Sequence, residues 1–390
     1  MSPVVVFSRL AMFSLLVVAV GCASFERRQR LLAETIAPAA PQQIAGTHRL
    51  FVATSRAETK EPGVVFSGDR APKLSYAFVD ISVPSVHEPG KLERSPTARV
   101  ADPARYFAAR RLGLYASSQS FEEALRKSIA ERGGRALVFV HGFNTSFGEA
   151  AYRMTQIVHD SGYQGAPILF TWPSAARVVD YIYDNNSATA GRDALEETLR
   201  LVARSGARRV DLVAHSMGSW ITMEALRQLA ITGDRDLDGR LADVVLASPD
   251  IDVDVFKAQM RRYGIPDRSF FVLTSRDDRA LDLSRFIAGN RPRVGGAIDA
   301  AELAEYGVVV LDVTDFSSFD GLNHAKFAEN PLLIRLLGEA LVTSDENTPA
   351  ENELGRRLES LTQGIGQTVG TAAELIITTP FDVLNITVGQ

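Results

Sequence analysis

Cysteine and histidine are scarce in this chain of 390 residues, which contains one cysteine, Cys22, and six histidines spread along its length. A single cysteine excludes a disulfide within the chain, and the histidines lack the spacing of the common zinc sites. The chain also lacks an excess of positive charge, since its 42 lysines and arginines are outnumbered by 47 aspartates and glutamates, which leaves a net charge of −5. A nucleic-acid-binding domain is usually strongly basic. We therefore expect no metal, no cofactor and no nucleic-acid partner.

Apolar runs long enough to cross a membrane are missing as well. The apolar run at residues 10–20 is too short for a comfortable span but suits the core of a signal peptide. It ends in Ala19-Val20-Gly21-Cys22, which resembles a bacterial lipobox, a motif whose cysteine is lipidated and becomes the mature amino terminus. We therefore expect a signal peptide at 1–21 and a lipid anchor at Cys22. This anchor would hold the protein in the bacterial cell envelope, on the periplasmic side of the outer membrane.

An uncleaved amino-terminal anchor is the alternative to lipidation. Arg27, Arg28 and Arg30 place positive charge directly after the lipobox-like motif, where it disfavours export.

The most informative segment of the chain is Ala214-His215-Ser216-Met217-Gly218. Before this segment, apolar residues occur at every second position, as at Val210 and Leu212, and predict a short strand. The spacing of the apolar residues after it predicts a helix. Ser216 then lies at a strand-to-helix turn, with a small residue two positions before it and another two after it. Small residues let the two backbones pass close together, so that the hydroxyl projects clear of the sheet. This is the nucleophile elbow pattern, with alanine in place of its first glycine.

Short apolar segments alternate with helical ones along most of the chain. We predict eight strands, at residues 49–53, 77–83, 137–140, 167–170, 210–214, 243–248, 269–274 and 307–313. Such alternation predicts a mostly parallel sheet with helices on both faces. The serine follows the fifth strand, where α/β-hydrolases carry their nucleophile, so we predict an α/β-hydrolase fold with eight strands. Only residues 249–268 separate the sixth and seventh strands, so no large cap domain is expected there.

An oxyanion hole is predicted from two backbone amides. In α/β-hydrolases one amide belongs to the residue after the nucleophile, and the other belongs to the loop after the third strand. Here these residues are Met217 and Phe143. Gly142 lets the backbone approach the substrate oxygen closely, so we assign it to substrate binding.

A serine hydroxyl needs a base to take its proton and a carboxylate to orient that base. Of the histidines, His324 alone follows the last predicted strand, as the Ser…Asp…His order of this fold requires. For the acid, Asp278 is preferred because it follows the seventh strand. Asp277 next to it and Asp250 after the sixth strand stay open, and one of the paired aspartates is also expected to cap the helix that follows.

At this point the chain resembles a family of bacterial α/β-hydrolases of uncharacterised function. The residues that carry the resemblance are the motifs Val140-His141-Gly142-Phe143-Asn144 and Thr171-Trp172-Pro173-Ser174. It extends from His48 to His324 and includes Val52-Ala53-Thr54-Ser55-Arg56, Tyr183-Asp184 and Asp278-Arg279-Ala280-Leu281. The resemblance implies an esterase- or lipase-like hydrolase with a triad of Ser216, Asp278 and His324.

Trp172 follows the fourth strand at the carboxyl edge of the sheet. We therefore expect it to line the substrate pocket, with an ordinary role in anchoring its loop as the alternative.

These patterns divide the chain into four parts. We expect a signal peptide at 1–21, a linker at 22–46, an α/β-hydrolase domain at 47–343, and a carboxyl-terminal loop with an amphipathic helical tail at 344–390. The predicted function is cleavage of an ester or similar acyl bond by a serine hydrolase through an acyl-enzyme. The alternative is a non-catalytic envelope lipoprotein that uses the same fold as a binding scaffold.

Overall fold

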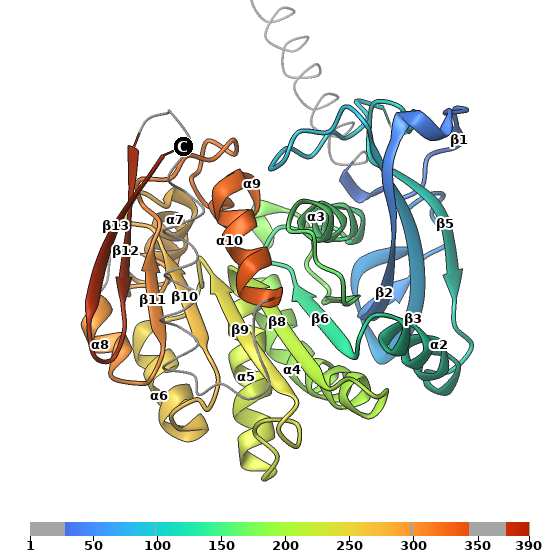
Figure 1. Cartoon of the computed structure of the whole chain (residues 1–390). Coiled ribbons are helices and arrows are strands. Elements are labelled where there is room, and N and C mark those ends of the chain that lie inside the picture. Colours follow the sequence, from blue (N-terminus) through green and yellow to red (C-terminus); the bar gives the residue numbers. More distant parts are fainter. Residues whose placement is uncertain (1–27, 98, 297–298, 343–371, 390) are drawn as a thin grey trace, which may run out of the picture.

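An eleven-stranded sheet organises the computed structural model, which describes residues 28–97, 99–296, 299–342 and 372–389 (Figure 1). Its strand order is β13-β12-β11-β10-β9-β8-β6-β7-β2-β3-β5. These strands are β2 (Ile44–Glu58), β3 (Phe66–Pro84), β5 (Ala108–Leu114), β6 (Arg135–Val140), β7 (Ala166–Thr171), β8 (Arg209–His215), β9 (Leu241–Ala247), β10 (Phe270–Thr274), β11 (Val309–Asp312), β12 (Ala372–Thr378) and β13 (Val383–Gly389). All neighbours from β2 to β11 in that order pair in parallel. Antiparallel strands extend both edges.

Helices cover both faces of this sheet. The helices α2 (Ser118–Glu131), α4 (Tyr181–Arg204), α5 (Met217–Ile231) and α6 (Val253–Tyr263) pack on one face, and α3 (Phe147–Asp160), α9 (Lys326–Glu329) and α10 (Pro331–Val342) pack on the other (Figure 1). Each face of the sheet has its own apolar core. In β6, Val138 and Val140 belong to the core on the side of α5, and Leu137 and Phe139 belong to the core on the side of α3. Because side chains of a strand alternate between faces, a strand buried on both faces is apolar throughout.

Smaller elements connect these layers. They are α7 (Arg279–Ile287), α8 (Ala300–Ala304), the 3-10 turns η1 (Pro41–Gln43) and η2 (Val178–Asp180), and a separate parallel pair of β1 (Thr35–Ile36) with β4 (Val100–Ala101). Between β9 and β10 the chain forms α6 and its flanking loops, so the predicted absence of a large cap at this point is confirmed. Among the residues that the structure describes, none of the helices is long and apolar enough to span a bilayer.

The prediction of a mostly parallel α/β-hydrolase sheet is confirmed, but the prediction of eight strands is too low. The eight predicted strands correspond to β2, β3, β6, β7, β8, β9, β10 and β11. The first additional strand, β5, pairs only with β3 and exposes Arg110 and Arg111. An edge strand of this kind is half polar, so it lacks the continuous apolar run that marks a central strand.

The carboxyl-terminal prediction is wrong for residues 372–389. We expected a helical tail, but β12 and β13 form a hairpin whose first strand pairs antiparallel with β11. Ala373, Leu375 and Ile377 are buried in alternation with the exposed Glu374, which is the period of a strand rather than a helix. The predicted amphipathic helix at 354–369 lies outside the described residues.

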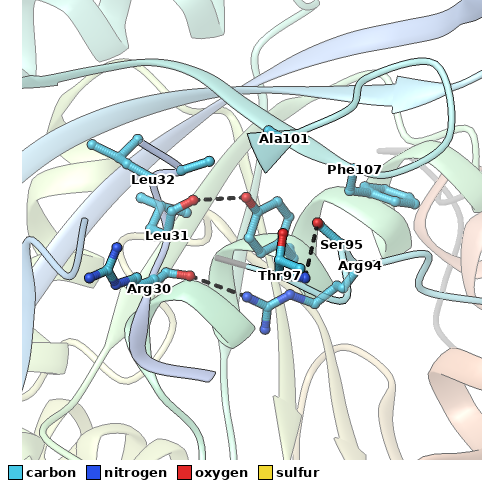
Figure 2. Close-up of a pocket in the computed structure, with 10 residues that line it drawn as sticks. Arg30, Leu31, Leu32, Arg94, Ser95, Thr97, Ala101 and Phe107 are labelled. Atoms are coloured by element: carbon cyan, nitrogen blue, oxygen red, sulfur yellow. Dashed lines mark hydrogen bonds between the residues drawn. The ribbon is translucent and has the colours of Figure 1, made fainter. Parts of the chain in front are cut away.

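The prediction of a linker at 22–46 is wrong for the part that the structure describes, residues 28–46. Leu31 is only 2% exposed, and its carbonyl accepts a hydrogen bond of 2.8 Å from the hydroxyl of Tyr152 on α3. Arg94 donates to the carbonyl of Arg30 at 3.2 Å. Residues 30–33 line one side of a cavity of about 30 Å³ (Figure 2). The folded domain therefore begins before residue 47. The predicted signal peptide and the lipidation site Cys22 lie outside the described residues.

Candidate active site

Ser216 occupies a strained turn between β8 and α5. Its φ of 53° and ψ of −124° are unusual for a residue other than glycine, and a backbone of this kind costs about 1–3 kcal/mol. The turn is held because the amide of Ser216 donates to the carbonyl of Ala247 at the end of β9, at 2.9 Å. The side chain is therefore fixed at the carboxyl edge of the sheet, as the elbow motif predicts.

Two glycines permit this turn to pack against the end of β6. A Cβ on Gly218 would lie 2.4 Å from the carbonyl oxygen of His141, so any side chain there would displace α5 from the sheet. A Cβ on Gly142 would lie 2.8 Å from the Cβ of Ser216. A glycine is thus required at position 142 because it lies so close to Ser216, although Gly142 does not line the cavity described below.

His324 is held by Asp278 in the loop that follows β11. The Nδ1 of His324 lies 2.7 Å from Oδ2 of Asp278, which accepts its N–H and leaves Nε2 as the basic nitrogen. Burial lowers the pKa of His324, but the hydrogen bond and charge of Asp278 raise it more, with further contributions from Asp250 and Asp320, so its pKa lies above the ordinary value. Asp320 also accepts the backbone N–H of His324 at 3.0 Å, which fixes the loop.

The three candidate acids have different partners. Asp278 binds His324 with one oxygen, and its other oxygen caps α7 by accepting the amide of Leu281 at 3.0 Å. Asp277 instead contacts Lys326 at 2.7 Å. Its pKa is lowered, because the hydrogen bond and charge of Lys326, together with its other hydrogen bonds, outweigh the burial that raises it. The geometry therefore brings His324 together with Asp278 rather than with Asp277.

Asp250 belongs to a separate buried group at the edge of the cavity. It accepts hydrogen bonds from Ser284 at 2.5 Å and from Tyr181 at 3.0 Å, and it lies 3.3 Å from the guanidinium of Arg293. Asp250 raises the pKa of His324 through its negative charge and forms no hydrogen bond with the imidazole. The helix cap of α6 is Asp252 rather than Asp250.

The other histidines near this site are neutral. The imidazole of His215 lies 4.7 Å from that of His324, centre to centre, and burial followed by the charge of His324 lowers its pKa well below the ordinary value. His141 is buried under the elbow, where desolvation and then Arg56 lower its pKa to about 3. A neutral His215 adds no positive charge beside His324.

The predicted oxyanion donors both lie beside Ser216. Met217 is the first residue of α5, where a helix leaves its amide N–H without an intrahelical acceptor. Phe143 lies in the loop after β6, and no acceptor for its amide occurs among the described residues. Both amides are thus available to an anion, and the amino-terminal end of a helix favours negative charge.

A fully buried arginine holds this loop in place. The guanidinium of Arg56, on β2, donates to the carbonyls of Thr145 at 2.7 Å and Ser174 at 2.9 Å, and to the hydroxyl of Thr171 at 2.8 Å. Burial lowers its pKa to about 10 against the opposing charges of Asp184 and other groups, so it stays protonated at neutral pH. Arg56 therefore joins the loop after β6 to the loop after β7.

Asp184 completes this connection from α4. Its carboxylate accepts from the hydroxyl of Ser174 at 2.6 Å and from the amides of Ala175 at 2.7 Å and Asn144 at 3.3 Å. Burial raises the pKa of Asp184 more than these hydrogen bonds lower it. Sequence reasoning assigned no role to Arg56 or Asp184, although both fall inside the motifs of the family resemblance.

A cavity of about 180 Å³ opens above Ser216. Residues around it include Phe143, Tyr181, Ser216, Leu283, Leu322 and His324. The residues from α7 were not predicted, because an amphipathic helix gives no sign in its sequence of what its apolar side faces.

Trp172 does not line this cavity, which corrects its assignment to substrate binding. Its indole is fully buried, stacks on His141 with ring centres 5.1 Å apart, and donates from Nε1 to the carbonyl of His141 at 2.8 Å. It is the loop anchor that the sequence left as an alternative. Within the described part of the chain, no group of three or more histidine, cysteine or acidic side chains is placed to hold a metal ion.

The parallel sheet, the serine elbow at its carboxyl edge and the helices on both faces define an α/β-hydrolase fold. Residues 117–340 match the model of the family described as alpha/beta hydrolase of unknown function (DUF900), and the chain belongs to this family. No curated protein matches the chain. Among solved structures, an esterase of Pyrobaculum calidifontis is 12% identical, over 93% of this chain and 95% of that one, with a TM-score of 0.33.

Proposed function

We propose that this protein is a serine hydrolase that cleaves an ester or similar acyl bond. The observation that carries the proposal is the hydrogen bond between Asp278 and His324, on a cavity that Ser216 also lines. A buried carboxylate that fixes an imidazole beside a serine on a strained turn is the arrangement that activates a hydroxyl for attack.

The mechanism follows from the position of each group. His324 takes the proton of Ser216 as its Oγ forms a bond to the substrate carbonyl carbon, and the carbonyl oxygen becomes an oxyanion bound by the amides of Phe143 and Met217. When the carbon–alkoxide bond breaks, His324 gives the proton to the departing alcohol. Water then adds to the acyl-enzyme and loses a proton to His324. As the bond between the acyl carbon and Oγ of Ser216 breaks, His324 returns this proton to Oγ, and the acid leaves.

A fluorophosphonate probe tests the proposal, since only an activated serine attacks phosphorus readily. We expect the native chain to be labelled and Ser216→Ala to lose all labelling. Ser284→Ala is the matched control, because Ser284 lines the same cavity but is bound to Asp250. Labelling that survives in Ser216→Ala, or is absent from the native chain, would refute the function and favour a non-catalytic scaffold.

We also propose that the chain is held at a bacterial envelope membrane by lipid on Cys22. The lipobox-like motif supports this, and so does the use of the sole cysteine of the chain at that position. Expression with labelled palmitate should give a labelled protein, and Cys22→Ser should remove the label. A native chain without label would leave the uncleaved amino-terminal anchor as the form of attachment.

A further inference from the structure

The mouth of the cavity is surrounded by exposed apolar side chains. Val178, Leu283, Ile287 and Leu322 all line the cavity, yet each is between 42% and 53% exposed. They come from η2, from α7 and from the loop before His324, three segments far apart in sequence. Apolar side chains that gather from separate elements around a site mark a binding surface, whereas single exposed ones need no explanation.

More apolar side chains extend this surface outward on the same elements. Val179 and Ile182 follow Val178, and Phe286 lies beside Ile287 on α7; all three are 65% or more exposed and none lines the cavity. We call Val179, Ile182 and Phe286 the outer rim. Such residues cost solubility unless something apolar covers them in use.

The cavity itself is too small for a whole lipid. Its volume of about 180 Å³ is below the roughly 300–1,000 Å³ of pockets that enclose a drug-sized ligand. It has room for the ester group and the start of one acyl chain. The rest of a long substrate must therefore lie outside, against the apolar surface at the mouth.

The chain leaves the described structure beside this same mouth. Arg28 donates from Nη2 to the carbonyl of Asn144 at 2.6 Å and from Nε to Glu149 at 2.6 Å, and Ser146 donates to the carbonyl of Arg28 at 2.5 Å. Asn144 lines the cavity. Only residues 23–27 lie between Cys22 and Arg28, and even a fully extended chain of this length spans only about 20 Å. An anchor near residue 22 thus keeps the membrane surface close to the cavity.

We infer that the mouth of the active site lies against the membrane that holds the chain, with the outer rim in the lipid, and that the substrate is an acyl ester of a lipid in that membrane. This inference rests on the proposed hydrolase for the reaction and on the proposed anchor at Cys22 for the placement of the protein. The reaction is hydrolysis, so one lipid ester and one water give one fatty acid and one alcohol-bearing lipid.

The placement is tested by fluorescence on the full chain, reconstituted into vesicles of phosphatidylethanolamine and phosphatidylglycerol. A thiol-reactive fluorophore is attached to Phe286→Cys on the outer rim and to Phe381→Cys as the matched control. Phe381 is also strongly exposed, at 81%, but it lies in the turn after β12. Because β12 runs antiparallel to β11, this turn lies at the amino-terminal ends of the parallel strands, on the opposite side of the sheet from Ser216. The unsubstituted chain, labelled in parallel, measures any contribution from Cys22.

We expect brominated lipid to quench the Phe286→Cys label at least about threefold more than the Phe381→Cys label, because bromine quenches only at contact within the bilayer. Equal quenching of the two labels, or no association with vesicles, would overturn the placement. So would a Phe286→Cys label that is already shielded without vesicles, since a second copy or another segment of the chain would then cover the rim.

The substrate class is tested with Phe286→Gln and with Phe381→Gln as control. Phe286→Gln should lower hydrolysis of the vesicle lipid about tenfold, because less of the enzyme is seated on the bilayer, and leave turnover of a soluble short-chain ester unchanged. Phe381→Gln should change neither rate. If the native chain cleaves the soluble ester but not the vesicle lipid, the lipid assignment is wrong while the serine hydrolase proposal stands. If Phe286→Gln cleaves the vesicle lipid as fast as the native chain, the outer rim does not seat the enzyme on the bilayer. If Ser216→Ala keeps its labelling, the function fails and the quenching result still decides the placement.

Discussion

Asp278 binds His324 and caps α7 with the two oxygens of one carboxylate, at 2.7 Å from the imidazole Nδ1 and 3.0 Å from the amide of Leu281. The same side chain therefore stabilises a helix and orients an imidazole. Because asparagine caps a helix about as well as aspartate does, the two roles can be separated by one substitution.

Asp278→Asn should lower turnover of a soluble ester by about three to four orders of magnitude and leave the melting temperature nearly unchanged. The amide retains the cap but removes the charge that orients and stabilises the imidazolium. Asp277→Asn is the matched control, because Asp277 contacts Lys326 instead of His324. A larger loss in Asp277→Asn than in Asp278→Asn would contradict the assignment.

The pH dependence of the reaction follows from His324. Its pKa is raised above the ordinary 6.5, and it must be neutral to accept a proton, so kcat/KM should rise with pH through a midpoint above 6.5. In Asp278→Asn the residual activity should show a lower midpoint, since the charge that raises the pKa is lost. A pH–rate profile of both proteins measures this, and a midpoint that stays in place would show that Asp278 does not act on His324.

Gly142→Ala should impair catalysis more than folding. The new methyl group would lie 2.8 Å from the Cβ of Ser216, which forces the serine to move, and a displacement near 1 Å at a reacting atom can cost about a hundredfold in rate. Gly191→Ala in α4 is the control. There the Cβ meets Trp172 at an ordinary 3.6 Å, and removing a helical glycine should stabilise the protein by up to about 1 kcal/mol. Equal turnover in the two variants would show that the turn at Ser216 accommodates the new methyl group without a loss of rate.

Arg56→Lys should destabilise the protein by about 3 kcal/mol and reduce activity. An ammonium group cannot reach all the carbonyls that the buried guanidinium binds, so polar groups in the core lose their partners. Arg49→Lys on the same strand provides the comparison, because Arg49 is partly exposed and pairs with Asp80 at the surface. That change should lower the free energy of unfolding, measured with urea, by less than about 1 kcal/mol. Similar costs for both would mean that the buried network contributes little.

Asp211→Asn should stabilise the protein at high pH. Burial raises the pKa of Asp211 to about 6 against the opposing charge of Arg135 and a backbone hydrogen bond from Asp243. Since the folded-state pKa exceeds the unfolded value of 3.8, the contribution of this group to stability is complete below that value and is lost as the pH rises through about 6. The variant should gain about 1–3 kcal/mol at pH 8 and nothing near pH 4. Asp193→Asn is the control, because Asp193 is exposed. Its effect on the free energy of unfolding should be the same at both pH values.

The central strands and the elbow could be predicted because their causes are local. Strands such as β6 are buried on both faces and are therefore continuously apolar, here from residue 136 to residue 140, and the turn at Ser216 needs small residues at fixed positions. The order of Ser216, Asp278 and His324 along the chain also placed the site, since parallel strands bring their carboxyl ends to one edge. The edge strands β5 and β13 escaped notice because one pairing partner and partial exposure leave a weak apolar pattern, and β12, which lies between β11 and β13, was missed with them.

Tertiary structure alone decided which carboxylate meets His324. Asp277 and Asp278 are neighbours in sequence but point to Lys326 and His324, and this choice depends on a loop almost fifty residues further on. The burial of Trp172 was equally hidden, because its partner is the carbonyl of His141 in the loop after β6, about thirty residues earlier in the chain. Sequence patterns report which segments are apolar and where the backbone turns. They do not report which distant backbone groups surround a polar side chain, and it is those groups that settle the geometry of a site.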